Sequence, residues 1–472
     1  MNIRLGLLLL CSGGLCGVTR TVLVPRSVST DPTLELAMTY HHELQRQLKG
    51  DEFSWSVYAK PLFESSTKAY FLAQYLLPRC GCNNSCLSVR EDGLGNIGSP
   101  WLYLLAQPGS QFNSSLCMCP RYIKAGVLLD FRFNFDRFIR GLWLSASVAP
   151  LVAQNRLCLC ENPYGAAGSL SGYSSVIQAL NSYGTSTFCN RKSKVGVDDI
   201  QLKLGYTFNP HERWVLEAYL AGIIPTSNRQ RSCYFFEPQV GNGRHSGLGG
   251  GLMGQLIFHE GERGSLSLLY DAKYLYLFKH CQTRVFDLCN GDWSRYLLGA
   301  FQEAPSIGLP LLKSLTRSCQ VTPRSQASLW AAFHAQYRAF QLEVGGNFWW
   351  RQQELVGLGC RGFGSNVGIF DLAGALVGTP VSASRACIYQ TAGGDNVAPS
   401  DTTFTSLGSS AVNVCSATQP QAYTGKAYAA LGAEANDWRY PFQASFGGFY
   451  EWSNRCAALN MWGAWASLGF QF

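Results

Sequence analysis

The chain has 472 residues, of which 14% are charged and 13% aromatic, and it contains 49 glycines and 12 tryptophans. The net charge of +8 is modest for this length, and no basic run indicates nucleic-acid binding. No run of about 18 apolar residues occurs, so a membrane-spanning helix is not expected. This combination is unusual for a soluble protein but typical of a transmembrane β-barrel, because alternation along each strand dilutes the apolar residues.

The first residues have the anatomy of a secretory signal peptide. A short basic start, MNIR, precedes the apolar run LGLLLLCSGGLCG, and small residues suited to cleavage lie at positions 14–17. We therefore expect residues 1–17 to be removed on export. A lipoprotein signal is disfavoured because leucine precedes both Cys11 and Cys16, where lipoprotein processing needs a small residue.

The segment that follows predicts a helix. The stretch DPTLELAMTYHHELQRQLKG begins at Asp31 and Pro32, a typical helix start, and ends at Gly50, a typical stop. We expect residues 18–50 to form a periplasmic segment with a short helix, and plugging of the barrel from below is the alternative. Its two histidines are sequence neighbours and point apart on a helix, so we do not expect a metal site there.

From residue 51 onward the chain shows repeated period-two alternation. In GVLLDFRFNF (126–135), apolar residues share one face, while Asp130, Arg132 and Asn134 share the other. The stretches IQLKLGYTF (200–208) and FQLEVGGNFWW (340–350) behave in the same way. Together with a strand near residues 51–60 and a terminal strand, the pattern predicts twelve strands joined alternately by short links and long polar connections. The long connections span approximately residues 150–198, 224–246, 279–326 and 351–423.

An even strand count, with short turns at one end and long loops at the other, predicts an all-β fold. We expect an antiparallel transmembrane β-barrel over residues 51–472, with about 12 strands, within a range of roughly 10–16. Long loops would then be extracellular, and the short turns and both ends of the barrel periplasmic. A soluble β-sandwich also alternates, but it seldom carries such long loops together with an export signal.

The chain ends in MWGAWASLGFQF, in which Phe470 and Phe472 share a face with apolar or small residues at every second position. This ending resembles the C-terminal signal of porin-like outer-membrane β-barrels of Gram-negative bacteria. The resemblance implies an outer-membrane location, contact with outer-membrane lipids, and recognition of Phe470 and Phe472 by the barrel assembly machinery. A looser likeness is to cysteine-rich major outer membrane proteins of chlamydia-like intracellular bacteria.

Eighteen cysteines are present, and the sixteen outside the signal peptide all fall in predicted connections rather than strands. Extracellular loops allow disulfides to persist, and each predicted loop holds an odd number, so full pairing would join different loops. Bonds between molecules, forming a surface lattice, are the alternative. Metal binding by CGCNNSC is disfavoured because no second ligand pair follows at zinc-site spacing. The disulfide candidates are Cys80, Cys82, Cys86, Cys117, Cys119, Cys158, Cys160, Cys189, Cys233, Cys281, Cys289, Cys319, Cys360, Cys387, Cys415 and Cys456.

The predicted inward face carries charges of both signs, which fits a water-filled channel because these charges would face water rather than lipid. A charge-paired, plugged interior is the alternative. The stretch SGYSSVIQALNSYG, in the loop after residue 150, suits a short helix that either constricts the pore or caps the outside. The candidate pore-lining residues are Arg132, Lys203, Glu217, Asp271, Lys273, Arg338, Glu343 and Arg439.

The sequence thus predicts an outer-membrane channel, or porin, for passive diffusion of small polar solutes. Two other functions stay open: a structural surface protein or adhesin with a closed bore, and a channel for hydrophobic solutes. We expect no catalytic residues, cofactor or metal, although an outer-membrane protease or lipase is a minor alternative. A homo-oligomer is compatible with the pattern.

Overall fold

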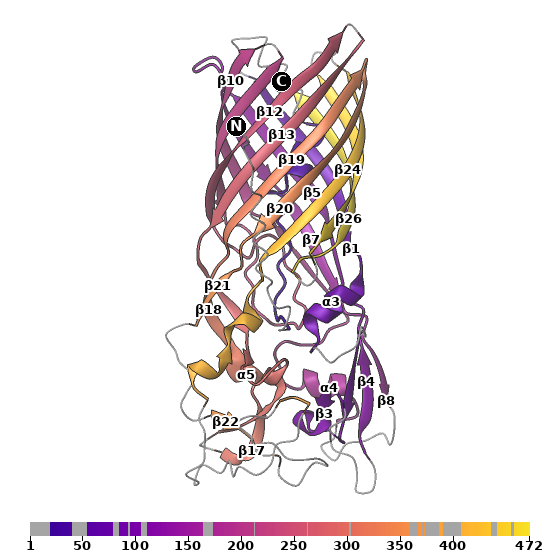
Figure 1. Cartoon of the computed structure of the whole chain (residues 1–472), viewed down its shortest axis with the longest axis vertical. Helices are drawn as coiled ribbons and strands as arrows, with labels where there is room; N and C mark the ends of the chain where they lie inside the picture. The colour runs from indigo at the N-terminus through magenta and orange to yellow at the C-terminus, as the bar shows by residue number, and fades with distance from the viewer. Residues whose placement is uncertain are drawn as a thin grey trace, which may run out of the picture.

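The computed structural model describes residues 19–39, 54–78, 85–92, 95–104, 111–163, 173–211, 213–261, 263–301, 304–358, 367–370, 372, 387–389, 407–435, 441–454 and 457–472. Their architecture has two parts, a tall β-barrel and a mixed cap of small sheets and short helices at one barrel end (Figure 1). The cap is built from the long connections, and the short turns lie at the opposite end.

Twelve antiparallel strands close the barrel, as the sequence predicts. The order around the wall is β1-β26-β25-β24-β20-β19-β13-β12-β11-β10-β6-β5, and β5 pairs again with β1. The strands are β1 (Ser54–Ser66), β5 (Arg121–Asn134), β6 (Leu142–Val148), β10 (Ile200–His211), β11 (Trp214–Ile224), β12 (Gly247–Gly261), β13 (Gly264–Leu277), β19 (Arg324–Tyr337), β20 (Phe340–Arg351), β24 (Ala422–Ala435), β25 (Phe442–Ser453) and β26 (Met461–Gln471).

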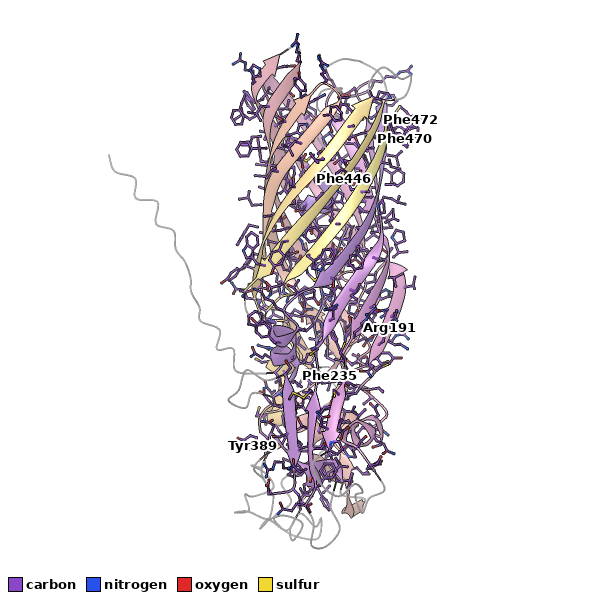
Figure 2. The ribbon with its side chains drawn as sticks, turned by 90° about the vertical axis from the view of Figure 1, so that its right-hand side faces the viewer. Arg191, Phe235, Tyr389, Phe446, Phe470 and Phe472 are labelled. Carbon is purple, nitrogen blue, oxygen red and sulfur yellow. A yellow bond between two sulfur atoms is a disulfide. The ribbon has the colours of Figure 1, made fainter. Side chains whose placement is uncertain are left out.

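Alternation of side chains along the strands separates an apolar exterior from a polar interior. In β26 every second residue is exposed, and Leu468 and Phe470 are among these outward residues. Phe446 on β25 is 62% exposed and points outward like Phe470 (Figure 2). A closed barrel with this exterior needs a lipid surround, since its edges are satisfied and its outer face is apolar. None of the described helices is long and apolar enough to cross a membrane. The chain is an outer-membrane β-barrel.

The two ends of the barrel sequence meet where the sequence predicts. The Trp55 and Phe472 backbones exchange two hydrogen bonds, at 3.1 and 2.9 Å, and their rings stack with centroids 4.0 Å apart. Strand β26 continues this pairing with β1 as far as Met461 opposite Ser66. The terminal phenylalanine therefore closes the barrel seam at the short-turn end.

One predicted loop in fact contributes to the wall. Within the predicted connection 150–198, strands β7 (Pro150–Arg156) and β9 (Arg191–Val197) extend the sheet beyond β6 and β10 toward the cap. β7 pairs with β5 and β9 pairs with β7, so the sheet order ends at β9. The alternation in this stretch is short and rich in polar residues, which made it look like a loop.

The cap consists of small sheets and short helices. Its strands are β2 (Cys86–Arg90), β3 (Ile97–Gly98), β4 (Asn113–Cys117), β8 (Cys160–Pro163), β14 (His280–Val285), β15 (Asp287–Leu288), β16 (Leu298–Phe301), β17 (Ala304–Pro310), β18 (Thr316–Thr322), β21 (Leu355–Leu358), β22 (Val367–Ile369) and β23 (Val412–Asn413). Its helices are α3 (Ala69–Leu76), α4 (Val176–Asn181) and α5 (Leu312–Leu315), and its interior is packed with aromatic residues such as Trp293, Tyr296 and Phe235.

Candidate functional site

Residues 19–39 run through the interior of the molecule, and we call them the plug segment. At the cap, Thr21 N donates to Ser416 O at 2.9 Å. Further in, Ser27 Oγ donates to Asp198 Oδ1 at 2.8 Å, just before the loop end of β10. Met38 N donates to Glu343 Oε2 at 3.1 Å, three residues from the turn end of β20. The plug segment therefore enters the barrel from the cap and reaches deep into the bore.

This position corrects the predicted periplasmic location. Residues 19–39 lie inside the barrel but enter it from the cap rather than from below, so they match neither predicted position, and residues 40–50 lie outside the described residues. The described helix is also much shorter than the predicted one, because α1 spans only Pro32–Leu36. It ends where Ala37 becomes extended and Met38 takes a left-handed conformation with φ of 58°.

Glu35 on the plug segment is bound by two wall lysines. Its carboxylate forms ion pairs with Lys203 and with Lys273, the latter at 3.4 Å, and accepts a hydrogen bond from Gln201 Nε2 at 3.1 Å. All four side chains are buried. Charge-assisted contacts of this kind are stronger than neutral hydrogen bonds, so Glu35 is a principal anchor of the plug segment.

Asp31 forms a second anchor on the opposite part of the wall. Its carboxylate pairs with Lys426, which also pairs with Glu451 at 3.2 Å, and with Arg26 of the plug segment itself at 3.6 Å. Asp31 Oδ1 also accepts a hydrogen bond from Thr33 N at 3.1 Å and so caps the start of α1. One side chain thus fixes both the helix and its place in the bore.

The end of α1 is held by a wall lysine. Lys60 Nζ on β1 donates to the carbonyls of Leu34, Glu35 and Ala37 at 2.9, 3.3 and 2.7 Å. These are carbonyls that lack helical partners at a helix C-terminus, where a cation is favoured. The bore therefore binds the plug segment through its backbone as well as through its carboxylates.

Six of the eight candidate pore-lining residues lie buried in the barrel interior. Lys203 and Lys273 bind Glu35, and Glu343 binds Met38 N. The other three are Arg132, Glu217 and Asp271. Arg132 pairs with Glu217 at 2.9 Å, and Asp271 accepts a hydrogen bond from Tyr219 Oη at 2.6 Å. Arg338 was placed wrongly, because it lies exposed at the tight turn between β19 and β20. Arg439 lies outside the described residues.

Sequence reasoning missed Lys60, Asp31 and Glu35 as parts of this site. Lys60 shares the inward face of β1 with Tyr58, which was a usable signal. Asp31 and Glu35 are four residues apart on the predicted helix and so share a face. However, no local sequence pattern indicates that this face contacts three strands that are distant in the chain.

The short helix predicted within the connection 150–198 belongs to the cap. α4 follows Ser175, whose side chain accepts from Gln178 N, and its first amide, Val176 N, donates to Glu161 Oε1 at 2.6 Å. It lies among cap elements and away from the barrel (Figure 1). The external of the two predicted positions is therefore the one found.

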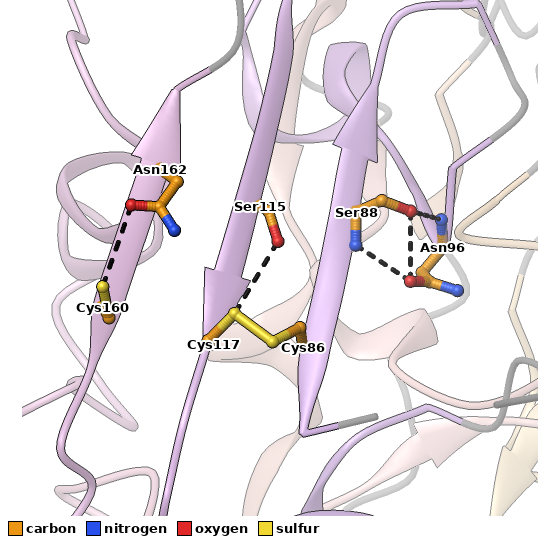
Figure 3. Close-up of a disulfide and its surroundings, with 7 residues drawn as sticks. All are labelled: Cys86, Ser88, Asn96, Ser115, Cys117, Cys160 and Asn162. Carbon is orange, nitrogen blue, oxygen red and sulfur yellow. Dashed lines mark hydrogen bonds between the residues drawn. A yellow bond between two sulfur atoms is a disulfide. The ribbon is translucent and has the colours of Figure 1, made fainter. Parts of the chain in front are cut away.

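One disulfide is present among the described cysteines, between Cys86 and Cys117 (Figure 3). It joins β2 to β4 within the connection between β1 and β5 rather than joining two loops. Its two cysteines, and Cys160, Cys281 and Cys319, lie in short cap strands, so the prediction that no cysteine lies in a strand was wrong. Cys387 Sγ donates to Asn290 O at 2.7 Å. The other described candidates, without a disulfide in the structure, are Cys119, Cys158, Cys160, Cys189, Cys233, Cys281, Cys289, Cys319 and Cys415. Cys80, Cys82, Cys360 and Cys456 lie outside the described residues.

No family model matches the chain, and no curated protein matches it. Among solved structures, an outer-membrane channel from Pseudomonas putida F1 is similar at 9% identity and a TM-score of 0.37, covering 88% of this chain and 95% of that one. A FadL homologue from Pseudomonas aeruginosa is similar at 7% identity and a TM-score of 0.29, covering 96% and 99%. The outer membrane protease OmpT from Escherichia coli is similar at 8% identity and a TM-score of 0.24, covering 90% and 97%. TM-scores this low support no argument about function. The likeness to cysteine-rich chlamydial proteins stays a prediction.

Proposed function

We propose that the chain is a gated outer-membrane channel whose bore is closed by the plug segment and opens when that segment is displaced. The observation that supports this best is how the plug segment is held. It is bound to the wall by side-chain ion pairs and hydrogen bonds, whereas every wall strand is held by continuous strand pairing. The plug segment can therefore move without opening the barrel itself.

Small polar solutes are the proposed permeants. Displacing the plug segment removes two carboxylates from the bore and leaves Lys60, Lys203, Lys273 and Lys426 facing the lumen. Such a surface is costly in contact with hydrocarbon and favourable in contact with water and anions. The open bore would therefore be hydrated and would carry two fewer negative charges than the closed bore.

A channel for hydrophobic solutes is the second candidate, and one feature of the wall favours it. On the cap side of Ile200, where β10 begins, the wall continues as β9, which has a strand partner on one side only. The connection after β11 packs against one face of β9, with Asn228 and Val240 beside Gly196. Rearrangement of this connection would open the wall laterally.

Conductance in planar bilayers tests the proposal. We expect wild-type protein to open rarely and Glu35→Lys to open far more often, because the new lysine would repel Lys203 and Lys273. Glu260→Lys is the matched control, since Glu260 lies exposed near the β12–β13 turn. Folded Glu35→Lys protein that stays silent would remove the channel function and favour a closed-bore surface protein. Swelling of protein-containing vesicles in a solution of a small sugar separates the two channel candidates, because only a hydrated bore admits the sugar.

A further inference from the structure

Two cavities flank the plug segment at the mouth of the bore, beneath the cap. Their volumes are about 30 and 40 Å³, and they share the lining residues Val24, Pro25, Arg26, Trp349 and Arg351. A volume of this size holds roughly two or three water-sized atoms, the size of a carboxylate group. The wider empty space around them is about 530 and 480 Å³, including open solvent, which leaves room for a small organic group.

Arg26 has unused hydrogen-bonding capacity at these cavities. Its side chain is only 9% exposed, and its guanidinium lies 5.3 Å from the Trp349 ring centroid. Nη1 donates to Asn347 Oδ1 at 2.7 Å, while Nε and Nη2 have no hydrogen-bond partner among the described residues. Buried donors without partners carry a cost that a bound acceptor would remove.

Arg351 is a second buried guanidinium, and it forms no ion pair with any carboxylate that the structure describes. Its Nη1 donates to Val24 O at 3.3 Å and to Gln419 Oε1, and its Nη2 donates to Ala457 O at 2.7 Å. Its Nε has no partner among the described residues, and its guanidinium lies 5.7 Å from the same Trp349 ring. Burying a cation without a counter-ion is unfavourable, so this position favours an anion.

The nearby carboxylates are already engaged by other cations. Glu64 pairs with Lys124 at 2.9 Å, and Glu451 pairs with Lys426 at 3.2 Å. Asp31 is shared between Lys426 and Arg26. Glu354, which also lines one of the cavities, pairs with Arg284 at 3.4 Å. Each of these carboxylates is therefore matched by a cation, and Arg351 is left as one positive charge in excess among the described residues at the two cavities.

We propose that Arg26 and Arg351 bind the carboxylate of a small organic acid at the mouth of the bore. The planar fork of each guanidinium matches carboxylate geometry. Leu275, Leu277 and Pro323 line the larger space beside them, and these side chains would contact the apolar part of the acid. The inference names a substrate class for the proposed channel and rests on that function, but binding itself is measurable without transport.

Titration calorimetry on the folded full-length protein in detergent tests the site, with sodium benzoate as the probe and benzamide as its uncharged analogue. We expect benzoate to bind at least tenfold more tightly than benzamide. Arg26→Gln and Arg351→Gln should each weaken benzoate binding by about tenfold or more, since a hydrogen bond to a charged group contributes that much. Arg26→Lys should be intermediate, because it keeps the charge but loses the fork. Arg338→Gln, at the exposed turn, is the matched control and should bind like wild type.

The variants separate loss of binding from loss of folding. Arg351 belongs to the wall, so its replacement can impair assembly, whereas Arg26 lies on the plug segment outside the sheet. Any of three results would overturn the proposal. These are equal affinity for benzoate and benzamide, unchanged benzoate binding in Arg26→Gln, and displacement of benzoate by chloride at the same concentration as by another carboxylate. If the protein binds benzoate but shows no conductance in bilayers, the channel function is wrong and the binding site stands. Conductance without benzoate binding would do the reverse.

Discussion

Replacing Glu35 by glutamine should release the plug segment without changing the wall. The substitution keeps the size of the side chain but removes the charge that pairs with Lys203 and Lys273. The substitution breaks two buried ion pairs, and breaking a buried pair typically costs about 3–5 kcal/mol. The wall carboxylate Asp271 stays beside both lysines, so the lower end of this range applies. The loss falls on the closed state only, because in an open bore water would solvate both lysines.

A destabilisation of about 3 kcal/mol corresponds to a change on the order of 100-fold in the ratio of open to closed channels. Single-channel recording measures this ratio directly as open probability. Glu260→Gln serves as the control for loss of one acidic charge outside the bore. Replacing Lys203 by methionine in the Glu35→Gln background should restore part of the closed population, since an apolar side chain tolerates burial without a counter-ion.

The reasoning is refuted if Glu35→Gln and Glu260→Gln have the same open probability while both migrate as folded barrels. That outcome would mean that the ion pairs are not what retains the plug segment. The hydrogen bonds from Lys60 to three carbonyls would then be the next candidate.

Three further predictions concern the cap, the pH response and the seam. Cys86→Ser should destabilise the cap by about 3–4 kcal/mol, because the bond closes a loop with a sequence separation of 31; limited proteolysis should show faster cleavage of the cap with the barrel intact. Burial and the neighbouring Asp198 raise the pKa of Asp199, between β9 and β10, to about 7. The folded state therefore holds this proton more tightly than the unfolded chain, so stability should fall as the pH rises from about 4 to 7 and level off above. Asp199→Asn should flatten this slope in thermal unfolding measured across that range. Deleting Phe472 removes two hydrogen bonds and a stacked ring pair at the seam and should lower the yield of assembled barrel, measured by heat-dependent electrophoretic mobility.

The barrel could be predicted because its determinants are local. Each strand needs only the period-two pattern of its own residues, and Phe472 marks the seam through a pattern confined to the last strand. The prediction failed where the pattern was weak, as in β7 and β9, and where a charged residue sat at a turn, as with Arg338. The two-residue period assigns a face only to residues within a strand, and Arg338 lies in the turn after β19 has ended.

The contacts of the plug segment could not be predicted because its partners are distant in the chain. Asp31 caps and Glu35 lies on a five-residue helix, and the partners of these two residues come from β10, β13 and β24. Only the closed barrel brings those strands around one axis. The wall itself carries charges of both signs at this depth, and the plug segment adds two carboxylates, which pair with Lys203, Lys273 and Lys426.

This division of charge is what makes gating physically reasonable. Had the wall carried both members of each ion pair, as Arg132 and Glu217 do, displacing the plug segment would have left the wall neutral and unchanged. With Lys203, Lys273 and Lys426 paired to plug carboxylates instead, the same displacement changes the field in the bore. In the proposed channel, closing would therefore add two negative charges to the bore, and an anion entering past Arg26 and Arg351 would meet lysines that the opening had freed from Glu35 and Asp31.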